Sequence, residues 1–238
     1  MKVILNVDDY GYTKSQIDGT IYAYQNGVVT STTCLANSRD ELMEYAALKA
    51  KENPGLGIGC HLVLTLGECL TKGKTICEPD GTFKHVSLAE LESMDPNEVY
   101  LEFKAQIERF IKYFGKKPTH LDSHHYDYGL MNGNFMRSIL QRLTEEYGLN
   151  QGRGFNPDVL YVGELYNEFT YENFTNMLLA KLANGTLCVE QACHACFVDQ
   201  EMYEKSSYTY QRIQELKVVT SEQIKQFYKE HNIEKVHY

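Results

Sequence analysis

Apolar and polar residues alternate along the chain with two different spacings, which predict strands and helices in turn. An apolar run over residues 2–7 predicts a first strand, and apolar side chains at helical spacing over 15–26 predict a helix that stops at Gly27. Further strands are predicted at 28–34, within 56–66, and at 119–123, 159–162, 186–192 and 233–238. Further helices are predicted at 39–51, 97–114, 134–147 and 171–183, and from a capping box at 220–223 through 230. This alternation predicts an α/β fold with parallel strands, and the number of units favours a distorted (β/α) barrel in a single domain over residues 1–238.

Composition narrows the choice of partners. The chain has 238 residues, 43% of them hydrophobic, a formal net charge of −9 and a pI near 5.4. No cluster of Lys and Arg has the density expected of a protein that binds nucleic acid or an anionic membrane. Neither common glycine-rich phosphate-binding turn occurs, and no segment approaches the roughly 18 apolar residues of a membrane span. A neutral small molecule such as a sugar is the partner that we expect.

The cysteines indicate a reducing compartment. There are seven, an odd number, and the first residues lack the apolar core of a secretory signal because Asp8 interrupts it. We therefore expect a cytoplasmic protein in which most cysteines are small buried apolar side chains. The C-x-x-C spacing of Cys193 and Cys196 is also found in redox and zinc sites, but no second such motif accompanies it.

Residues 67–95 form a long polar stretch with a Pro79-Asp80-Gly81 turn. A connection of this length is usually functional or mobile, so a lid over a site and a contact between subunits are both open as its role.

Acidic and histidine side chains gather where predicted strands end. Asp8 and Asp9 directly follow the first apolar run, His61 interrupts the third strand, and His194 follows the strand at 186–192. The fourth strand ends in the sequence His120-Leu121-Asp122-Ser123-His124-His125. The carboxyl ends of parallel strands share one edge of the sheet, so these groups are expected to converge there. A helix cap at the acid pair and single core histidines are the structural alternatives, but so many coincidences at one edge are improbable.

The residue types predict a metal-assisted hydrolase. Two imidazoles and one carboxylate suit Zn²⁺, Mn²⁺, Co²⁺ or Fe²⁺, whereas Mg²⁺ prefers oxygen ligands. A divalent ion polarises a carbonyl and acidifies water. A second carboxylate is then able to take the proton of that water, and a histidine opposite is able to protonate the leaving group. This equipment suits the hydrolysis of an amide or an ester.

Four motifs resemble those of the YdjC-like carbohydrate deacetylases, which are also called chitooligosaccharide or diacetylchitobiose deacetylases. They are Asn6-x-Asp8-Asp9-Tyr10-Gly11, Asn26-Gly27-Val28-Val29-Thr30-Ser31-Thr32, Gly59-x-His61-Leu62-x-Leu64-Thr65 and Pro118-Thr119-His120-Leu121-Asp122-Ser123-His124-His125. A later stretch, from Ser206 through Arg212 and Glu215 to Ser221, is similar as well. The resemblance covers nearly the whole chain, with the motifs in the family's order.

The resemblance implies a barrel of the glycoside hydrolase and deacetylase type that removes N-acetyl groups from small sugars or chitooligosaccharides. It implies Asp9, His61 and His125 as metal ligands, Asp8 as general base and His194 as general acid. Strand alternation would favour His124 over His125 if the fourth strand continued so far, but we expect that strand to end before it. The family is described as Mg²⁺-dependent and often dimeric, so Mg²⁺ and Zn²⁺ are both candidate metals and a homodimer is expected.

Two departures from the family pattern bear on activity. Tyr126 and Tyr128 stand where the family often has histidine, and Ala195-Cys196 replaces a Pro-Gly pair after His194. Three functions are therefore compared. The first is a sugar N-deacetylase. The second is a metal-bearing barrel with another sugar reaction, an isomerase or a phosphoesterase. The third is a sugar- or metal-binding homologue without catalysis.

Overall fold

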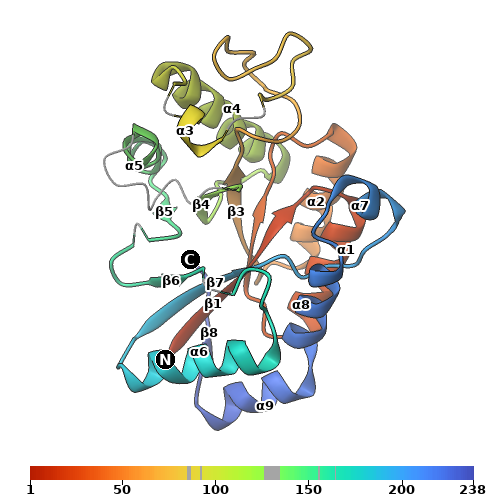
Figure 1. Cartoon of the computed structure of the whole chain (residues 1–238), viewed down its shortest axis with the longest axis vertical. Helices are drawn as coiled ribbons and strands as arrows, with labels where there is room; N and C mark the ends of the chain where they lie inside the picture. The colour runs from red at the N-terminus through yellow and green to blue at the C-terminus, as the bar shows by residue number, and fades with distance from the viewer. Residues whose placement is uncertain (85–86, 92, 126–134, 155, 164) are drawn as a thin grey trace.

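Parallel strands form a curved sheet at the centre of the molecule (Figure 1). The computed structural model describes residues 1–84, 87–91, 93–125, 135–154, 156–163 and 165–238. Its strands within these ranges are β1 (Lys2–Tyr10), β2 (Ser31–Cys34), β3 (Gly57–Leu62), β4 (His120–Ser123), β5 (Asn150–Gln151), β6 (Leu160–Val162), β7 (Cys188–Cys193) and β8 (Glu234–Lys235).

The order of the strands gives an incomplete barrel. The sheet runs β5-β4-β3-β2-β1-β7-β6, with β8 also paired to β1, and each recorded strand pair is parallel. The path ends at β5 and β6, so the sheet curves around without closing between these two strands within the described residues. The predicted distorted (β/α) barrel is confirmed in this half-barrel form.

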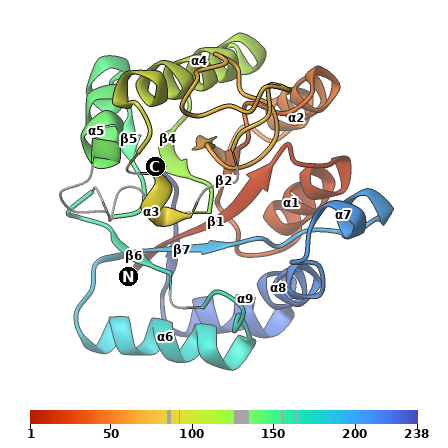
Figure 2. The same ribbon diagram turned by 45° about the horizontal axis from the view of Figure 1, so that its top comes forward.

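Helices surround the sheet on its outside (Figure 2). The helices in the described residues are α1 (Lys14–Asn26), α2 (Asp40–Glu52), α3 (Leu88–Leu91), α4 (Pro96–Phe114), α5 (Phe135–Tyr147), α6 (Tyr171–Ala183), α7 (Gln200–Lys205), α8 (Tyr210–Thr220) and α9 (Glu222–Glu230). The short α3 is the exception to this outer arrangement, since it lies in front of the strands in Figure 2. One apolar core lies between β2, β3 and helices α1, α2, α4 and α5, and a second lies between β1, β7 and helices α6, α8 and α9. None of the helices in the described ranges combines the length and the apolar character needed to cross a bilayer.

Two boundaries differ from the sequence-based prediction in ways that matter for the site. β1 continues through Tyr10, because the chain takes a register shift against β2 between Val7 and Tyr10 instead of leaving the sheet. Asp8 and Asp9 therefore belong to the strand itself. Near the end of the chain, α8 precedes the predicted last helix, and Ser221 caps α9 by accepting a hydrogen bond from the Ile224 amide at 3.2 Å.

The described part of residues 67–95 packs on α4. The Glu102 carboxylate accepts hydrogen bonds from the Leu70 and Thr71 amides, and Glu98 accepts from the Lys74 and Thr75 amides. Cys69 and Cys77 form a disulfide with Cα atoms 6.3 Å apart, which differs from the expectation of reduced cysteines for this pair. The other five cysteines are free.

Candidate metal centre and active site

The acid pair lies at the carboxyl end of β1, in the middle of the sheet. Asp8 and Asp9 are only 3% and 2% exposed. Asp9 has a φ of 65°, in the left-handed region that few residues other than glycine, Asn and Asp adopt. Successive residues of a regular strand point to opposite faces of the sheet. The local turn at Asp9 instead lets both neighbouring carboxylates face His61.

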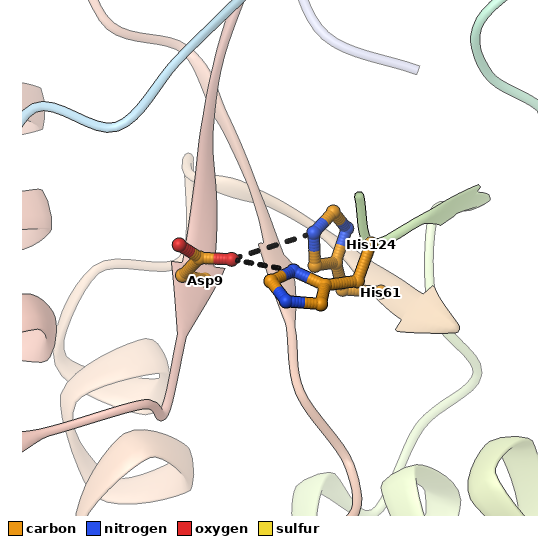
Figure 3. A group of neighbouring side chains, drawn as sticks. All are labelled: Asp9, His61 and His124. Atoms are coloured by element: carbon orange, nitrogen blue, oxygen red, sulfur yellow. Dashed lines mark ion pairs between the residues drawn. The ribbon is translucent and has the colours of Figure 1, made fainter. Parts of the chain in front are cut away.

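Asp9, His61 and His124 converge on one point (Figure 3). The Asp9 Oδ1 atom lies 3.1 Å from His124 Nδ1 and 3.5 Å from His61 Nε2. Atoms bound to one ion at 2.0–2.1 Å and at angles of 90–110° are roughly 2.8–3.4 Å apart, so these separations are close to those of a shared divalent cation. Within the described part of the chain, Asp9 Oδ1 and His124 Nε2 have no hydrogen-bond partner. The residues present fit a metal centre of two nitrogens and one oxygen.

A buried carboxylate orients the first histidine. His61 Nδ1 lies 2.6 Å from Asp122 Oδ1, and Thr33 donates a hydrogen bond to Asp122 Oδ2 at 2.9 Å. Burial by itself would lower the pKa of His61, but the Asp122 carboxylate outweighs it and raises that pKa to about 10. An Nδ1–H bond to Asp122 leaves Nε2 facing Asp9, which is the usual arrangement of a metal-binding histidine and its supporting carboxylate.

The structure brings His124, not His125, next to Asp9 and His61. The sheet contact continues beyond β4, because the His124 amide donates to the Leu62 carbonyl at 2.9 Å. Strand alternation therefore reaches His124, contrary to our expectation that the strand would already have ended. His125 follows with a φ of 64° and turns its Nδ1 to Thr65 Oγ1 at 2.9 Å. The geometry thus favours His124 as the third ligand.

A buried arginine holds Asp9 in place from α8. Arg212 donates from one terminal nitrogen to Asp9 Oδ2 at 2.7 Å and from the other to Gln16 Oε1 at 2.9 Å. Gln16 in turn donates to the Asp8 carbonyl at 2.8 Å. Burial of Asp9 opposes ionisation, but Arg212 and the two histidines outweigh it and hold the pKa of the Asp9 carboxyl well below its usual range. Asp9 is therefore an anion, as a metal ligand must be.

Asp8 has a separate set of partners. Asn6 donates to its Oδ1 at 2.8 Å, and the Arg153 guanidinium binds its Oδ2. The same guanidinium lies 3.0 Å from Asp122 Oδ2, so Arg153 bridges the two carboxylates that flank His61. Because the Arg153 guanidinium already lies between Asp8 and Asp122, we assign the metal position to Asp9, His61 and His124.

His194 faces Asp8 from the segment that follows β7. Its Nε2 lies 3.9 Å from Asp8 Oδ2, the same separation as that between His61 Nε2 and Asp8 Oδ2. The His194 amide donates to Glu215 on α8, and the Tyr208 hydroxyl donates to the other oxygen of Glu215 at 2.6 Å. The tether to Glu215 holds this segment over the site although Ala195 and Cys196 replace the family's Pro-Gly pair.

Asp8, His61, His124 and His194 line one cavity of about 250 Å³. Its walls are Asp8, His61, His124, His125, Arg153, Tyr161, Gly163, Leu165, Tyr166, Gln191, Ala192, His194 and Glu215. The volume suits part of a sugar with its acetyl group better than a whole oligosaccharide. None of the described residues in the 67–95 stretch lines it.

The structure brings Asp8, Asp9, His61 and His194 close together, and the roles assigned to them stay predictions. Sequence reasoning missed the role of Arg153, although a lone arginine between Gly152 and Gly154 was a visible signal. The Cys193 and Cys196 thiols are buried, and burial raises the pKa of Cys196 to about 12 and that of Cys193 far above its usual range, so the redox interpretation gains no support. Tyr126 and Tyr128 lie outside the described residues.

Fold and site together define an α/β half-barrel with a candidate divalent-metal centre at the carboxyl edge of its sheet. A model of the family described as YdjC-like protein matches residues 2–230, and the chain belongs to that family. Carbohydrate deacetylase 2 of Listeria innocua serovar 6a is 36% identical over 247 residues, covering 100% of this chain and 98% of the relative. Chitooligosaccharide deacetylase of Salmonella dublin is 35% identical over 240 residues, covering 94% of this chain and 92% of the relative.

Solved structures agree with the fold. A protein of Enterococcus faecalis V583, provisionally described as a cellobiose-phosphate cleavage protein, superposes with a TM-score of 0.88 at 30% identity, covering 100% of this chain and 97% of its own. A family 4 carbohydrate esterase from Streptomyces lividans, in complex with acetate, gives a TM-score of 0.56 at 12% identity, covering 99% and 92%. At that identity the esterase shares the fold alone.

Proposed function

We propose that this protein is a metal-dependent hydrolase that removes N-acetyl groups from acetylated sugars or chitooligosaccharides and releases acetate. The observation that carries the proposal is the convergence of Asp9, His61 and His124 beside Asp8, with His194 Nε2 3.9 Å from the Asp8 Oδ2 atom. The names of the curated relatives, carbohydrate deacetylase and chitooligosaccharide deacetylase, support the same reaction.

Each residue has a distinct task in this reaction. A divalent ion bound by Asp9, His61 and His124 would supply polarisation of the acetyl carbonyl and acidification of the attacking water. Asp8 Oδ2 takes a proton from the water while the water oxygen bonds to the acetyl carbon. His194 Nε2 gives a proton to the sugar nitrogen as the carbon–nitrogen bond breaks. Acetate and a free amino sugar result.

Aromatic side chains give the cavity a surface for a sugar ring. Tyr166 is 59% exposed at the cavity wall and stacks on Tyr208 with ring centroids 4.9 Å apart and planes 10° from parallel. The neighbouring Leu165 is buried in the same wall. Faces of sugar rings carry C–H groups that pack on such apolar surfaces, so Tyr166 and Leu165 are proposed to bind the substrate.

Finer properties remain part of the proposal. The donor set of two imidazoles and one carboxylate favours Zn²⁺ or a neighbouring transition metal, whereas the family resemblance favours Mg²⁺. One such ion is proposed for the chain. The homodimer, the cytoplasmic location and the single domain over residues 1–238 stay predictions from the sequence.

The test is acetate release. Protein loaded in turn with Zn²⁺, Mg²⁺, Mn²⁺ and Co²⁺ is incubated with N,N′-diacetylchitobiose and related N-acetylated sugars, and acetate is measured. Asp8→Asn is expected to lower kcat by about 100- to 10,000-fold while the metal content is unchanged. Asp18→Asn is the matched control, because Asp18 is a carboxylate on α1 that accepts from the Tyr45 hydroxyl instead of facing the cavity. No acetate with any metal, or full activity of Asp8→Asn, would contradict the proposal.

A second function is tested by adding cellobiose phosphate to the same panel, because the Enterococcus faecalis relative is described in terms of cellobiose-phosphate cleavage. Among the described residues that line the cavity, Arg153 is the single Arg or Lys, and its guanidinium is bound to Asp8 and Asp122. This charge balance disfavours a phosphorylated substrate. Cleavage of cellobiose phosphate without acetate release from any N-acetylated sugar would favour that reaction instead. Sugar binding without any turnover would favour the non-catalytic homologue.

A further inference from the structure

Arg153 reaches Asp8 from an unusual backbone conformation. It stands two residues after the end of β5 and has a φ of 49°, in the left-handed region that arginine rarely adopts. Such a residue keeps its conformation only where surrounding contacts fix it. The contact in this case is a hydrogen bond of 2.8 Å from the Arg153 amide to the Glu190 Oε2 atom.

Glu190 belongs to the opposite side of the sheet. It lies in the middle of β7, where it is paired in register with Ile4 of β1 and Tyr161 of β6. Its side chain is fully buried. Since β5 and β6 end the sheet without pairing to each other in the described residues, the bond from Glu190 to Arg153 joins two segments that the strand ladder leaves unconnected.

Tyr238 completes the contact from the end of the described chain, which lies near β4 in Figure 2. Its hydroxyl donates to the same Glu190 Oε2 atom at 2.7 Å. Its ring packs on His120 of β4, with centroids 4.5 Å apart. The Glu190 Oε2 atom thus accepts two hydrogen bonds. The one from the Arg153 amide fixes the Arg153 backbone, and the one from the Tyr238 hydroxyl holds the Glu190 carboxylate in place.

Stability alone does not explain a carboxyl group at this place. An apolar side chain at this buried position costs no desolvation of a polar group, whereas a buried carboxyl does. The other oxygen of Glu190, Oε1, has no hydrogen-bond partner among the described residues. What Glu190 does accomplish is to fix the backbone from which the Arg153 guanidinium binds Asp8, Asp122 and the Ser123 carbonyl.

We propose that Glu190 and Tyr238 are positioning residues for the reaction, which hold the Arg153 backbone so that its guanidinium fixes the catalytic base Asp8. The inference rests on the proposed deacetylation. Neither residue lines the cavity beside the metal group, so each acts through Arg153 and not on the substrate. A displacement of about 1 Å at a catalytic group is enough to cost roughly 100-fold in rate.

The experiment compares four variants by kcat and KM for acetate release. Glu190→Leu is expected to lower kcat by about 100-fold with KM nearly unchanged, since Asp8 acts on the reacting water and not on sugar binding. Glu190→Gln is expected to retain most of the activity, because its amide oxygen accepts the same two hydrogen bonds. Tyr238→Phe is expected to lower kcat about fivefold, the effect of one hydrogen bond. Tyr228→Phe is the matched control, because it removes a buried hydroxyl without a hydrogen-bond partner among the described residues.

Two results would overturn the inference. One is a Glu190→Leu enzyme whose folded fraction has the wild-type kcat, or whose KM alone changes. The other, decisive if Glu190→Leu does not fold, is a Tyr238→Phe enzyme with the same kcat as Tyr228→Phe. A purely structural role would lower the melting temperature of the Leu variant and give no rescue by Gln in kcat.

A readout without substrate separates this inference from the proposed function. The guanidinium protons of Arg153, observed by NMR, are expected to exchange slowly in the wild type and in Glu190→Gln and quickly in Glu190→Leu. If the wild type releases no acetate at all, the proposed function fails and this measurement alone decides the positioning role. Slow exchange in all three proteins would overturn it.

Discussion

Glu190 also gives the stability of the protein a defined dependence on pH. Burial raises the pKa of its carboxyl, and although Arg153 and the Tyr238 hydroxyl act in the opposite direction, the pKa rises from an ordinary 4.5 to about 7. Between these two values the folded protein keeps a proton that the unfolded chain has released. The free energy of unfolding therefore falls as the pH rises through this window.

The Glu190→Gln variant removes this titration while it keeps the shape of the side chain. Each pH unit between 4.5 and 7 changes the contribution of Glu190 to the free energy of unfolding by about 1.4 kcal/mol. Over the whole window the change is about 3 kcal/mol. The stability of Glu190→Gln relative to the wild type is expected to increase by about that amount from pH 4.5 to pH 8, where the effect levels off. His120, whose pKa burial lowers to about 4, titrates in both proteins, so its effect cancels in the difference.

Urea unfolding of both proteins at half-unit steps of pH measures this difference. The same chelator is present in every sample, so that bound metal does not contribute to the stability of either protein. A difference that stays constant from pH 4.5 to pH 8 would refute the reasoning, because it would mean that Glu190 ionises in the folded protein at its ordinary pKa.

Three other predictions follow from the site and its supports. His124→Ala is expected to lose the metal, while His125→Ala keeps one ion per chain; elemental analysis after dialysis decides, and equal loss from both would contradict our choice of ligand. Arg212→Leu leaves Asp9 as a buried anion without its cation and is expected to cost about 3 kcal/mol or more in urea unfolding of chelator-treated protein. Gly19→Ala would bring a Cβ within 2.6 Å of the Cys196 Cα, so we expect a loss of about 1–3 kcal/mol, seen as a lower melting temperature. An unchanged melting temperature would mean that α1 is able to move away from that segment.

The alternation of strands and helices was readable because local signals agree with the final packing. The helix expected at 171–183 is α6, where Thr170 accepts a hydrogen bond from the Asn173 amide and buried Phe174 and Leu178 recur at helical spacing. The gathering of acids and histidines at one edge was also predictable, since parallel strands have to bring their carboxyl ends together.

The sequence did not allow us to predict in the same way which side chains contact one another in the site. His124 and His125 are adjacent, and what separates them is one further sheet hydrogen bond to Leu62 followed by a left-handed turn. Arg153 and Glu190 contact across the open side of the sheet, and no periodicity in the sequence encodes a contact of that kind. The Cys69–Cys77 bridge likewise depends on how residues 67–84 fold back on themselves.

The left-handed backbone at Asp9 has a consequence for how this site would change under mutation. Asn and Gly tolerate that conformation as well as Asp does, so replacement of this one acid by either of them removes a charged metal ligand with little strain on the main chain. The cost of such a substitution lies in the side chains instead, because Arg212 would remain as a buried cation without its anion.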